Sequence, residues 1–514
     1  MLVKTFGSAV YGVNARTITV EVNVSNGRHF YLVGLPDNAV KECERRVESA
    51  LKTSGYYFPR TKVIVNLAPA DIRKTGTAFD LAIAIAILGA TGQIDEPEKL
   101  QNYVFMGELG LDGSILPIKG ALPIAIQTEK DGLKGLIIPE QNCKEAGMVE
   151  QLNIFGVTHV KQVVQFLKDP SCIEAVKINV KEEFLKSQRS YEIDFTDVKG
   201  QANIKRALEI AAAGSHNAIL IGPPGAGKTM LAKRLPTILP PLSLLEALET
   251  TKIHSVAGKL SVNSTMIAQR PFRSPHHSIS DAALVGGGTN PQPGEISLAH
   301  NGVLFLDELP EFKRTVLEVM RQPMEERMVT ISRAKIALEF PDSFMMIASM
   351  NPCPCGFFNH PEKECTCAPG IVQKYLNKIS GPLLDRIDLH VEVTPVPFNE
   401  LAQAEKTEAS DVIRERVMKA RALQTVRYKK LDGIYANAQM TSKMLKEVCV
   451  INSEGRQLLK AAMDRLNLSA RAYDRILKVS RTIADLDSSE NIENHHLAEA
   501  IHFRSLDRQG WGIT

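Results

Sequence analysis

Eight consecutive residues near the middle of the chain have the types and spacing of a phosphate-binding loop. They are Gly222, Pro223, Pro224, Gly225, Ala226, Gly227, Lys228 and Thr229. In this pattern glycines let backbone N–H groups surround phosphate oxygens, the lysine reaches the β- and γ-phosphates, and the hydroxyl binds Mg²⁺. The apolar run 218–221 predicts a buried strand before the loop, and residues 230–235 predict a helix after it. Because these elements follow in the order that the motif requires, the sequence predicts a site for ATP or GTP with Mg²⁺.

A second chemical motif ends an apolar run further along the chain. Residues 302–308 read GVLFLDE, which is typical of a buried strand followed by two carboxylates. Asp307 is predicted to hold the metal, and Glu308 to polarise the water that attacks the terminal phosphate. Together the two motifs predict a nucleotide hydrolase.

Three further residues are candidates for sensing the nucleotide. Asn351 ends an apolar run, so its amide could hydrogen-bond the water or the γ-phosphate, or it could cap a turn. Arg386 could be offered to a neighbouring subunit's ATP, or it could form an ion pair with Asp385 or Asp388. Arg471, at the start of a predicted helix, could fold over the phosphates or could be a solvated helix residue. No catalytic role is assigned to a nearby basic cluster: Arg270, Arg273, His276 and His277.

Four of the eight cysteines lie close together in the sequence: Cys353, Cys355, Cys365 and Cys367. Two C-x-C pairs could fold back into a tetrahedral thiolate site for Zn²⁺, although zinc ribbons more often use C-x-x-C. The alternative is a loop of reduced thiols. The other cysteines are predicted to be small core residues: Cys43, Cys143, Cys172 and Cys449.

The composition is that of a modular protein without a membrane span. At 514 residues the chain exceeds what one hydrophobic core supports, so roughly two to four domains are expected. The longest apolar run, 81–90, is too short to cross a bilayer. The first residues lack the regions of a signal peptide, so we expect a cytoplasmic location. A net charge of +3 does not demand an anionic partner, and it leaves nucleic acid open.

We expect a multidomain α/β chain with four parts. Residues 1–175 mix strands and helices as in an α+β domain, and 176–192 form a charged linker. Residues 193–396 alternate apolar strands and helices, as in a doubly wound parallel sheet, and 397–514 are helical. The predicted strands of the first part are 15–24, 62–66 and 136–139, and the predicted helices of the first and last parts are 41–53, 79–88, 400–428, 441–466, 469–484 and 491–504.

Segments 302–308 and 380–388 resemble the AAA+ superfamily and, within it, the magnesium-chelatase-like branch. A closer likeness, to the bacterial YifB/ComM proteins, runs over essentially the whole chain, and its most specific segments are 34–40, 66–71, 270–277, 351–356 and 469–475. The resemblance implies an AAA+ ATPase core with a C-terminal helical lid, working as a homohexamer with ATP and Mg²⁺. For the ComM members it implies a DNA helicase that promotes branch migration during recombination and natural transformation.

The N-terminal part resembles the proteolytic domain of Lon and the matching domain of the RadA recombination ATPase. By this resemblance Thr77 takes the place of the nucleophile, and Leu122 stands where Lon has its lysine. Leu122 cannot accept a proton, and Lys119 is three residues away, whereas a general base must come within hydrogen-bond reach of its nucleophile. We therefore expect a non-proteolytic domain that serves ring assembly or DNA contact.

Residues 328–332 and 336–340 alternate in polarity around a basic tip, which predicts a β-hairpin. In the related replicative helicases of the MCM type a hairpin at this point projects into the pore. The resemblance places Arg333 or Lys335 against a phosphate backbone, a contact that gives affinity without sequence readout. The alternative is a surface hairpin with solubilising charges. The glycine-rich segment 284–294 is consistent with another pore loop.

Three functions are weighed on these grounds. The favoured one is an ATP-driven hexameric motor that acts on single-stranded or branched DNA. The alternatives are a protein-remodelling ATPase of the magnesium-chelatase type and an ATP-dependent protease. The basic hairpin and the RadA-like N-terminal part favour the DNA motor.

Overall fold

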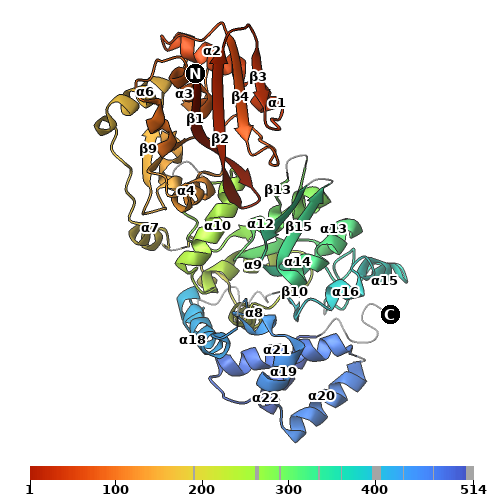
Figure 1. Cartoon of the computed structure of the whole chain (residues 1–514). Coiled ribbons are helices and arrows are strands. Elements are labelled where there is room, and N and C mark those ends of the chain that lie inside the picture. The colour runs from red at the N-terminus through yellow and green to blue at the C-terminus, as the bar shows by residue number, and fades with distance from the viewer. Residues whose placement is uncertain are drawn as a thin grey trace.

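The computed structural model describes residues 1–188, 191–260, 265–288, 291–333, 336–360, 362–395, 407–431, 433–466 and 468–504. The described chain is a mixed α/β structure with a parallel-sheet core and a helical C-terminal part, as the sequence predicts. Figure 1 shows the N-terminal sheet at the top, the parallel sheet in the middle and the C-terminal helices at the bottom.

The N-terminal part is built on a mixed seven-stranded sheet in the order β3-β4-β2-β1-β5-β8-β9. Side chains on β2 and β4 alternate between buried and half-buried or exposed, because the sheet carries its core on one face. The strands are β1 (Leu2–Tyr11), β2 (Asn14–Ser25), β3 (Phe30–Val33), β4 (Lys62–Ala68), β5 (Tyr103–Phe105), β8 (Gly135–Pro139) and β9 (Asn153–Val157), with a separate pair β6 (Glu108–Leu109) and β7 (Ile115–Leu116).

Helices cover this sheet. The predicted helices 41–53 and 79–88 are confirmed as α2 and α3, with ends shifted by one or two residues. Every residue of α3 is buried, because its apolar residues surround the helix. The helices are α1 (Asn38–Lys41), α2 (Cys43–Thr53), α3 (Asp80–Ala90), α4 (Ala121–Lys130), α5 (Cys143–Ala146) and α6 (Val160–Lys168), with 3-10 turns at η1 (Pro97–Asn102), η2 (Glu140–Asn142) and η3 (Pro170–Cys172).

The predicted linker 176–192 contains an ordered helix, α7 (Val180–Ser187). The Asn179 side chain caps this helix by accepting a hydrogen bond from the Glu182 N–H (3.2 Å), a cap that was not predicted among the charged residues. Val180 packs into the apolar cluster between α4 and the middle part of the chain. The boundaries of the four parts stay predictions.

The middle part is a five-stranded parallel sheet in the order β11-β14-β17-β10-β18. Three of its strands are buried along their whole length, as expected for strands covered on both faces: β10 (Ala218–Ile221), β14 (Val303–Leu306) and β17 (Met345–Met350). The edge strands are β11 (Phe272–Arg273) and β18 (Leu389–Glu392). Since β10 lies between β17 and β18, the loop that follows it opens at the centre of the carboxyl edge, where ligands bind in such sheets.

The helices of the middle part are α8 (Ala202–Gly214), α9 (Lys228–Ile238), α10 (Leu244–Ala257), α11 (Asp281–Val285), α12 (Glu295–Leu298), α13 (Arg314–Val319), α14 (Arg321–Glu326), α15 (Ile371–Leu376) and α16 (Gly381–Leu384), with 3-10 turns at η4 (Phe195–Asp197) and η5 (Leu309–Glu311). Apolar clusters join one face of the parallel sheet to α8 and α9 and the other face to α11, α12, α13 and α16, while α10 packs against α4.

Two insertions form small antiparallel pairs. The predicted hairpin is present as β15 (Met328–Arg333) and β16 (Ile336–Pro341), and the glycine-rich segment contains β12 (Gly286–Gly287) and β13 (Gln292–Pro293). The turn between β1 and β2 rests on the larger hairpin, because the Tyr11 hydroxyl donates to the Ala337 carbonyl (3.3 Å) and Val13 packs in the same apolar cluster. The N-terminal part therefore contacts the hairpin directly.

The C-terminal part is helical, with two corrections to the prediction. Residues 441–466 form two helices rather than one, because the Asn452 side chain accepts from the Gly455 N–H (2.7 Å) and starts a second helix. The predicted helix 400–428 begins at Ser410, whose N–H donates to Asp194, and residues 400–406 lie outside the described chain. The helices are α18 (Ser410–Tyr428), α19 (Ser442–Val448), α20 (Ser453–Leu466), α21 (Ala470–Leu486) and α22 (Asn494–His502), with the turn η6 (Asn437–Gln439).

Among the residues described, no helix has both the length and the apolar surface that crossing a bilayer requires.

Candidate functional site

The predicted phosphate-binding loop joins β10 to α9, so the first N–H groups of α9 lie at the carboxyl edge of the sheet. Gly225 and Gly227 have φ angles of +79° and +82°, a region that other residues rarely adopt. Gly222 is required for space, because a Cβ there would lie 2.3 Å from the Val393 carbonyl oxygen at the end of β18. Gly225 and Gly227 therefore allow the left-handed backbone of this loop, and Gly222 allows its close approach to Val393.

Lys228 points back over the loop toward the neighbouring strand. Its Nζ donates to the carbonyl oxygens of Gly222 (2.7 Å) and Pro223 (2.9 Å) and to Asn351 Oδ1 (3.1 Å). Burial lowers the pKa of Lys228 from its usual value, while the carboxylates of Asp307 and Glu308 act in the opposite direction. The structure thus brings the predicted phosphate-binding lysine and the predicted sensor amide together.

Thr229 and Asp307 meet across the strand ends. Thr229 Oγ1 donates to Asp307 Oδ2 (2.8 Å), and the buried Ser349 hydroxyl donates to Asp307 Oδ1. A hydroxyl and a carboxylate side by side are hard oxygen ligands of the kind that Mg²⁺ prefers, so these residues fit the predicted metal. Ser349 was not predicted, because it lies inside the apolar strand β17.

Glu308 has a different environment from Asp307. Its backbone is left-handed, with φ +56°, and its side chain is exposed. His277 Nδ1 lies 3.7 Å from Glu308 Oε2, and the ring of His276 packs at a tilt of 35° against that of His277, with centroids 4.0 Å apart. The sequence alone predicts no role for these two histidines. Their position just after β11, the parallel neighbour of β14, could have indicated that they lie beside Glu308.

The two candidate arginines have contrasting surroundings. Arg386 is 6% exposed, donates to the Pro382 carbonyl (2.6 Å) and forms an ion pair with Glu325. Burial lowers its pKa, and Glu325 acts in the opposite direction. Arg471 is largely exposed, and its Nη1 lies 3.7 Å from Asp385 Oδ2. The alternative prediction for Arg386 was an ion pair with Asp385 or Asp388, whereas the ion pair in the structure is with Glu325.

Asp388 belongs to a buried network between the parallel sheet and the C-terminal helices. It accepts from Arg475 Nη1 (3.0 Å), and its other oxygen lies 3.3 Å from His216 Nδ1. Burial alone would raise the pKa of Asp388, but Arg475 and His216 together lower it well below its usual value. This network joins α21 to the start of β18.

The four cysteines of the predicted zinc site are brought together. Cys353 is buried and the others are half-buried, and their sulfur atoms all lie within 4.8 Å of one another: Cys353, Cys355, Cys365 and Cys367. The predicted DNA contacts cannot be placed in this way. Lys335 and the side chain of Arg333 lie outside the described part of the chain, although the backbone of Arg333 pairs with Ile336.

In the N-terminal part the Thr77 hydroxyl donates to Glu108 Oε2. Thr77 and Lys119 line one cavity of about 960 Å³, which also touches Leu338 of β16. Leu122 is buried in α4. The Thr77 hydroxyl is therefore held by a carboxylate, and Leu122, at the position of the lysine in Lon, has no group that can accept a proton.

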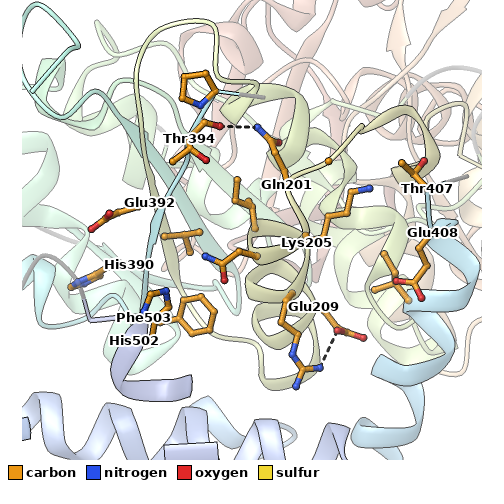
Figure 2. Close-up of a pocket in the computed structure, with 18 of the residues that line it drawn as sticks. Gln201, Lys205, Glu209, His390, Glu392, Thr394, Thr407, Glu408, His502 and Phe503 are labelled. Carbon is orange, nitrogen blue, oxygen red and sulfur yellow. Dashed lines mark hydrogen bonds and ion pairs between the residues drawn. The ribbon is translucent and has the colours of Figure 1, made fainter. Parts of the chain in front are cut away.

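The cavity drawn in Figure 2, of about 1060 Å³, lies beside α8 and the end of β18. Gln201 joins it to the phosphate-binding loop by donating to the Ala226 carbonyl (2.9 Å). Its basic residues are engaged: Arg206 pairs with Glu209 and Glu499, Arg416 pairs with Glu209 and Glu408, and Lys205 donates to the Val198 carbonyl. Polyphosphate therefore fits the loop better than this cavity.

Comparisons with known proteins agree with this architecture. The family model "Magnesium chelatase, subunit ChlI" matches residues 194–401, and the models "Subunit ChlI of Mg-chelatase" and "Magnesium chelatase, subunit ChlI C-terminal" match residues 20–142 and 407–504. "Competence protein ComM" of Haemophilus influenzae is 45% identical over 505 residues, which cover 98% of this chain and 97% of that protein.

"Uncharacterized protein YifB" of Escherichia coli is 44% identical over 502 residues, covering 97% of this chain and 96% of that protein. "Lon protease 2" of Bacillus subtilis is 30% identical over 154 residues, which cover 27% of this chain and 26% of that protein. The fold and the family models define a magnesium-chelatase-like protein of AAA+ type. Within that class the chain belongs to the YifB/ComM family.

Proposed function

We propose that this protein is an ATPase that drives a DNA motor promoting branch migration. The observation that carries the ATPase part is the meeting of Lys228, Thr229, Asp307 and Asn351 at the ends of three adjacent parallel strands, β10, β14 and β17. Side chains on three separate segments that meet in this way can surround one polyphosphate.

The residues divide the chemistry in the following way. The N–H groups at the start of α9 and Lys228 Nζ bind phosphate oxygens, and Thr229 with Asp307 would hold Mg²⁺. Mg²⁺, when bound, would neutralise charge on the β- and γ-phosphates. Glu308 takes a proton from, or orients, the attacking water, and the half-buried His277 positions that carboxylate. Asn351 reports on the γ-phosphate through the oxygen that now accepts from Lys228.

We further propose that the active form is a homohexamer, with Arg386 acting on a neighbouring subunit's ATP. Because Arg386 is paired with Glu325 inside the subunit, engaging the phosphate requires exchange of one anionic partner for another. Arg471, exposed at the start of α21, can approach the phosphates from the lid. Both arginines stabilise negative charge that develops during phosphoryl transfer.

DNA as the partner is supported by the likeness to a relative whose printed name is that of a competence protein. It is also supported by the hairpin β15–β16, where Arg333 and Lys335 can contact phosphates of single-stranded or branched DNA. A cytoplasmic location is part of this proposal, since the ATP and the DNA are there. The second candidate is protein remodelling, which the three magnesium-chelatase family models favour.

The test is strand displacement from labelled three-stranded or Holliday-type DNA by the purified protein with ATP. The double variant Arg333→Ala/Lys335→Ala should keep basal ATP turnover, lose branch migration, and lower the slope of DNA affinity against salt by about one unit for each contact removed. Arg456→Ala/Lys460→Ala, at two exposed positions of α20, is the matched charge control. Wild-type branch migration by the hairpin variant would favour protein remodelling.

A further inference from the structure

The four clustered cysteines have a geometry that suits one metal ion. The Sγ of Cys353 lies 3.2 Å from that of Cys355 and 3.7 Å from that of Cys365, and Cys355 and Cys365 are 3.5 Å apart. Zinc bound tetrahedrally at about 2.3 Å from each sulfur separates the sulfurs by about 3.8 Å. A disulfide requires about 2.05 Å, and all four cysteines are free thiols. A single ion at the centre can therefore reach every sulfur.

The segment around the cysteines has few apolar contacts and little regular secondary structure to stabilise it. Residues 351–360 and 362–370 contain no helix or strand, and the buried members of their apolar cluster are Cys353, Phe358 and Val372. The Phe358 N–H donates to Cys353 Sγ (3.3 Å), a backbone contact that favours a thiolate and orients it toward a metal. An apolar cluster this small needs a cross-link, such as a bound metal ion, to order a loop of this length.

The cysteine-containing segment is in direct contact with the phosphate-binding loop. It begins at Asn351, which accepts from Lys228, and Cys353 follows two residues later. Gly356 packs on the phosphate-binding loop so closely that a Cβ would lie 2.5 Å from Pro224 Cδ. Gly356 in turn donates to the Cys353 carbonyl (3.0 Å). A group that holds Cys353 in place therefore also holds Gly356, which packs against the phosphate-binding loop.

We propose that Cys353, Cys355, Cys365 and Cys367 hold one structural Zn²⁺, which braces the phosphate-binding loop through Gly356 and Pro224 and positions Asn351. A zinc ion held by four thiolates has no open position, so it takes no part in hydrolysis. The bracing role rests on the proposed nucleotide site, whereas zinc binding does not.

The first experiment measures metal in the purified full-length protein by mass spectrometry. We expect about one zinc per protomer, retained by Cys172→Ser and Cys449→Ser and lost from Cys353→Ser/Cys365→Ser. Cobalt substitution of the wild type should give the thiolate-to-metal charge-transfer band and the visible bands of a tetrahedral site. Cys172, predicted to be a core residue, is exposed, whereas Cys43, Cys143 and Cys449 are buried as predicted. Wild-type protein that holds no metal after zinc-replete purification, with all four thiols as reactive as Cys172, overturns the proposal even if the cysteine variants do not fold.

The second experiment tests the bracing role with fluorescent ATP. Gly356→Ala should keep zinc but weaken nucleotide binding about tenfold, because its new methyl group displaces Pro224. Gly370→Ala is the control, since Gly370 also has positive φ (+78° against +87°) but has open space around its Cβ position. Equal nucleotide affinity for the two variants, with zinc bound in both, overturns the bracing role. Absence of nucleotide binding by the wild type would instead reject the proposed ATPase.

Discussion

Asp307 and Glu308, the carboxylates that follow β14, differ in how firmly their surroundings hold them. Both oxygens of Asp307 accept hydrogen bonds, from Thr229 and Ser349. The Glu308 carboxylate is exposed, and the His277 imidazole lies 3.7 Å from one of its oxygens. A fixed carboxylate suits a metal ligand, whereas one that can reorient suits a group that meets water. Their surroundings support the separate roles proposed for them.

Replacing Glu308 should separate binding from hydrolysis. We expect Glu308→Gln to bind ATP normally but to turn it over about 10²- to 10⁴-fold more slowly, because the amide cannot accept a proton. Lys228→Ala should lose both steps. Glu311→Gln is the control, since Glu311 is a nearby carboxylate that pairs with Lys378 on the surface. Steady-state turnover and fluorescent-nucleotide titration measure the two effects, and normal turnover by Glu308→Gln would reject its assignment.

Ser349 offers a second test at the same carboxylate. Ser349→Ala removes a buried donor from Asp307, which should raise the Mg²⁺ concentration needed for half-maximal ATP turnover about tenfold. Ser343→Ala, in the residues just before β17, should leave the Mg²⁺ requirement unchanged. If both variants require the same Mg²⁺ concentration as the wild type, Asp307 does not depend on Ser349.

The sequence predicted Asp307 and Asn351 because each of them directly follows a largely apolar run. Asp307 follows β14 and Asn351 follows β17, so parallel strands bring them to one edge. Ser349 was missed because a polar residue within an apolar strand carries no sign of which neighbour it faces. His277 was missed because its place depends on how the chain turns after the two-residue strand β11.

At the scale of elements, the join between the C-terminal helices and the parallel sheet depends on buried charge. Asp388 at the start of β18 binds Arg475 of α21 and His216 after α8. The partners of Asp388 are distant in sequence, so the sequence alone could not predict them. The prediction of one helix over 441–466 failed for a different, local reason: the pattern of apolar residues continues, but Asn452 bonds the N–H of Gly455, three residues later, and restarts the helix.

We expect Asp388→Asn to lower the free energy of unfolding by about 2 to 3 kcal/mol, because it removes the buried anion that pairs with half-buried Arg475. Asp464→Asn makes the same charge change on exposed α20 and should be nearly neutral. The folded-state pKa of Asp388 is depressed, so its contribution is present above its unfolded-state pKa and is lost as the pH falls through the folded-state value. Denaturant unfolding of both variants near neutral pH, with acid titration of the wild type, tests this. Equal stability of the two variants would contradict the prediction.

At the scale of the whole molecule, the candidate trans-acting arginine is held inside its own subunit. Arg386 is buried against Glu325 and the Pro382 carbonyl. Ring assembly would therefore have to turn this side chain outward. The sequence predicted the position of Arg386 before a strand but not its partner, because Glu325 lies on α14, far away in the chain.

Mixing variants tests the shared site. Arg386→Ala and Lys228→Ala should each be inactive alone, but mixed rings contain some interfaces with both residues intact and should recover part of the ATP turnover. Mixing Lys228→Ala with Glu308→Gln is the control, because both changes lie in the same half of the site, and it should give no recovery. Absence of recovery in rings shown to be mixed would contradict a trans-acting Arg386.

Helix α3 has a consequence for how the molecule forms. Each of its residues, Asp80–Ala90, is buried, so the helix has no face that water can solvate favourably. During synthesis it emerges after β1, β2 and β4, and it must be covered by that sheet at once or be exposed to aggregation. We infer that the N-terminal sheet and α3 form a single cooperative folding unit, whose amide hydrogens are among the slowest of the chain to exchange with solvent.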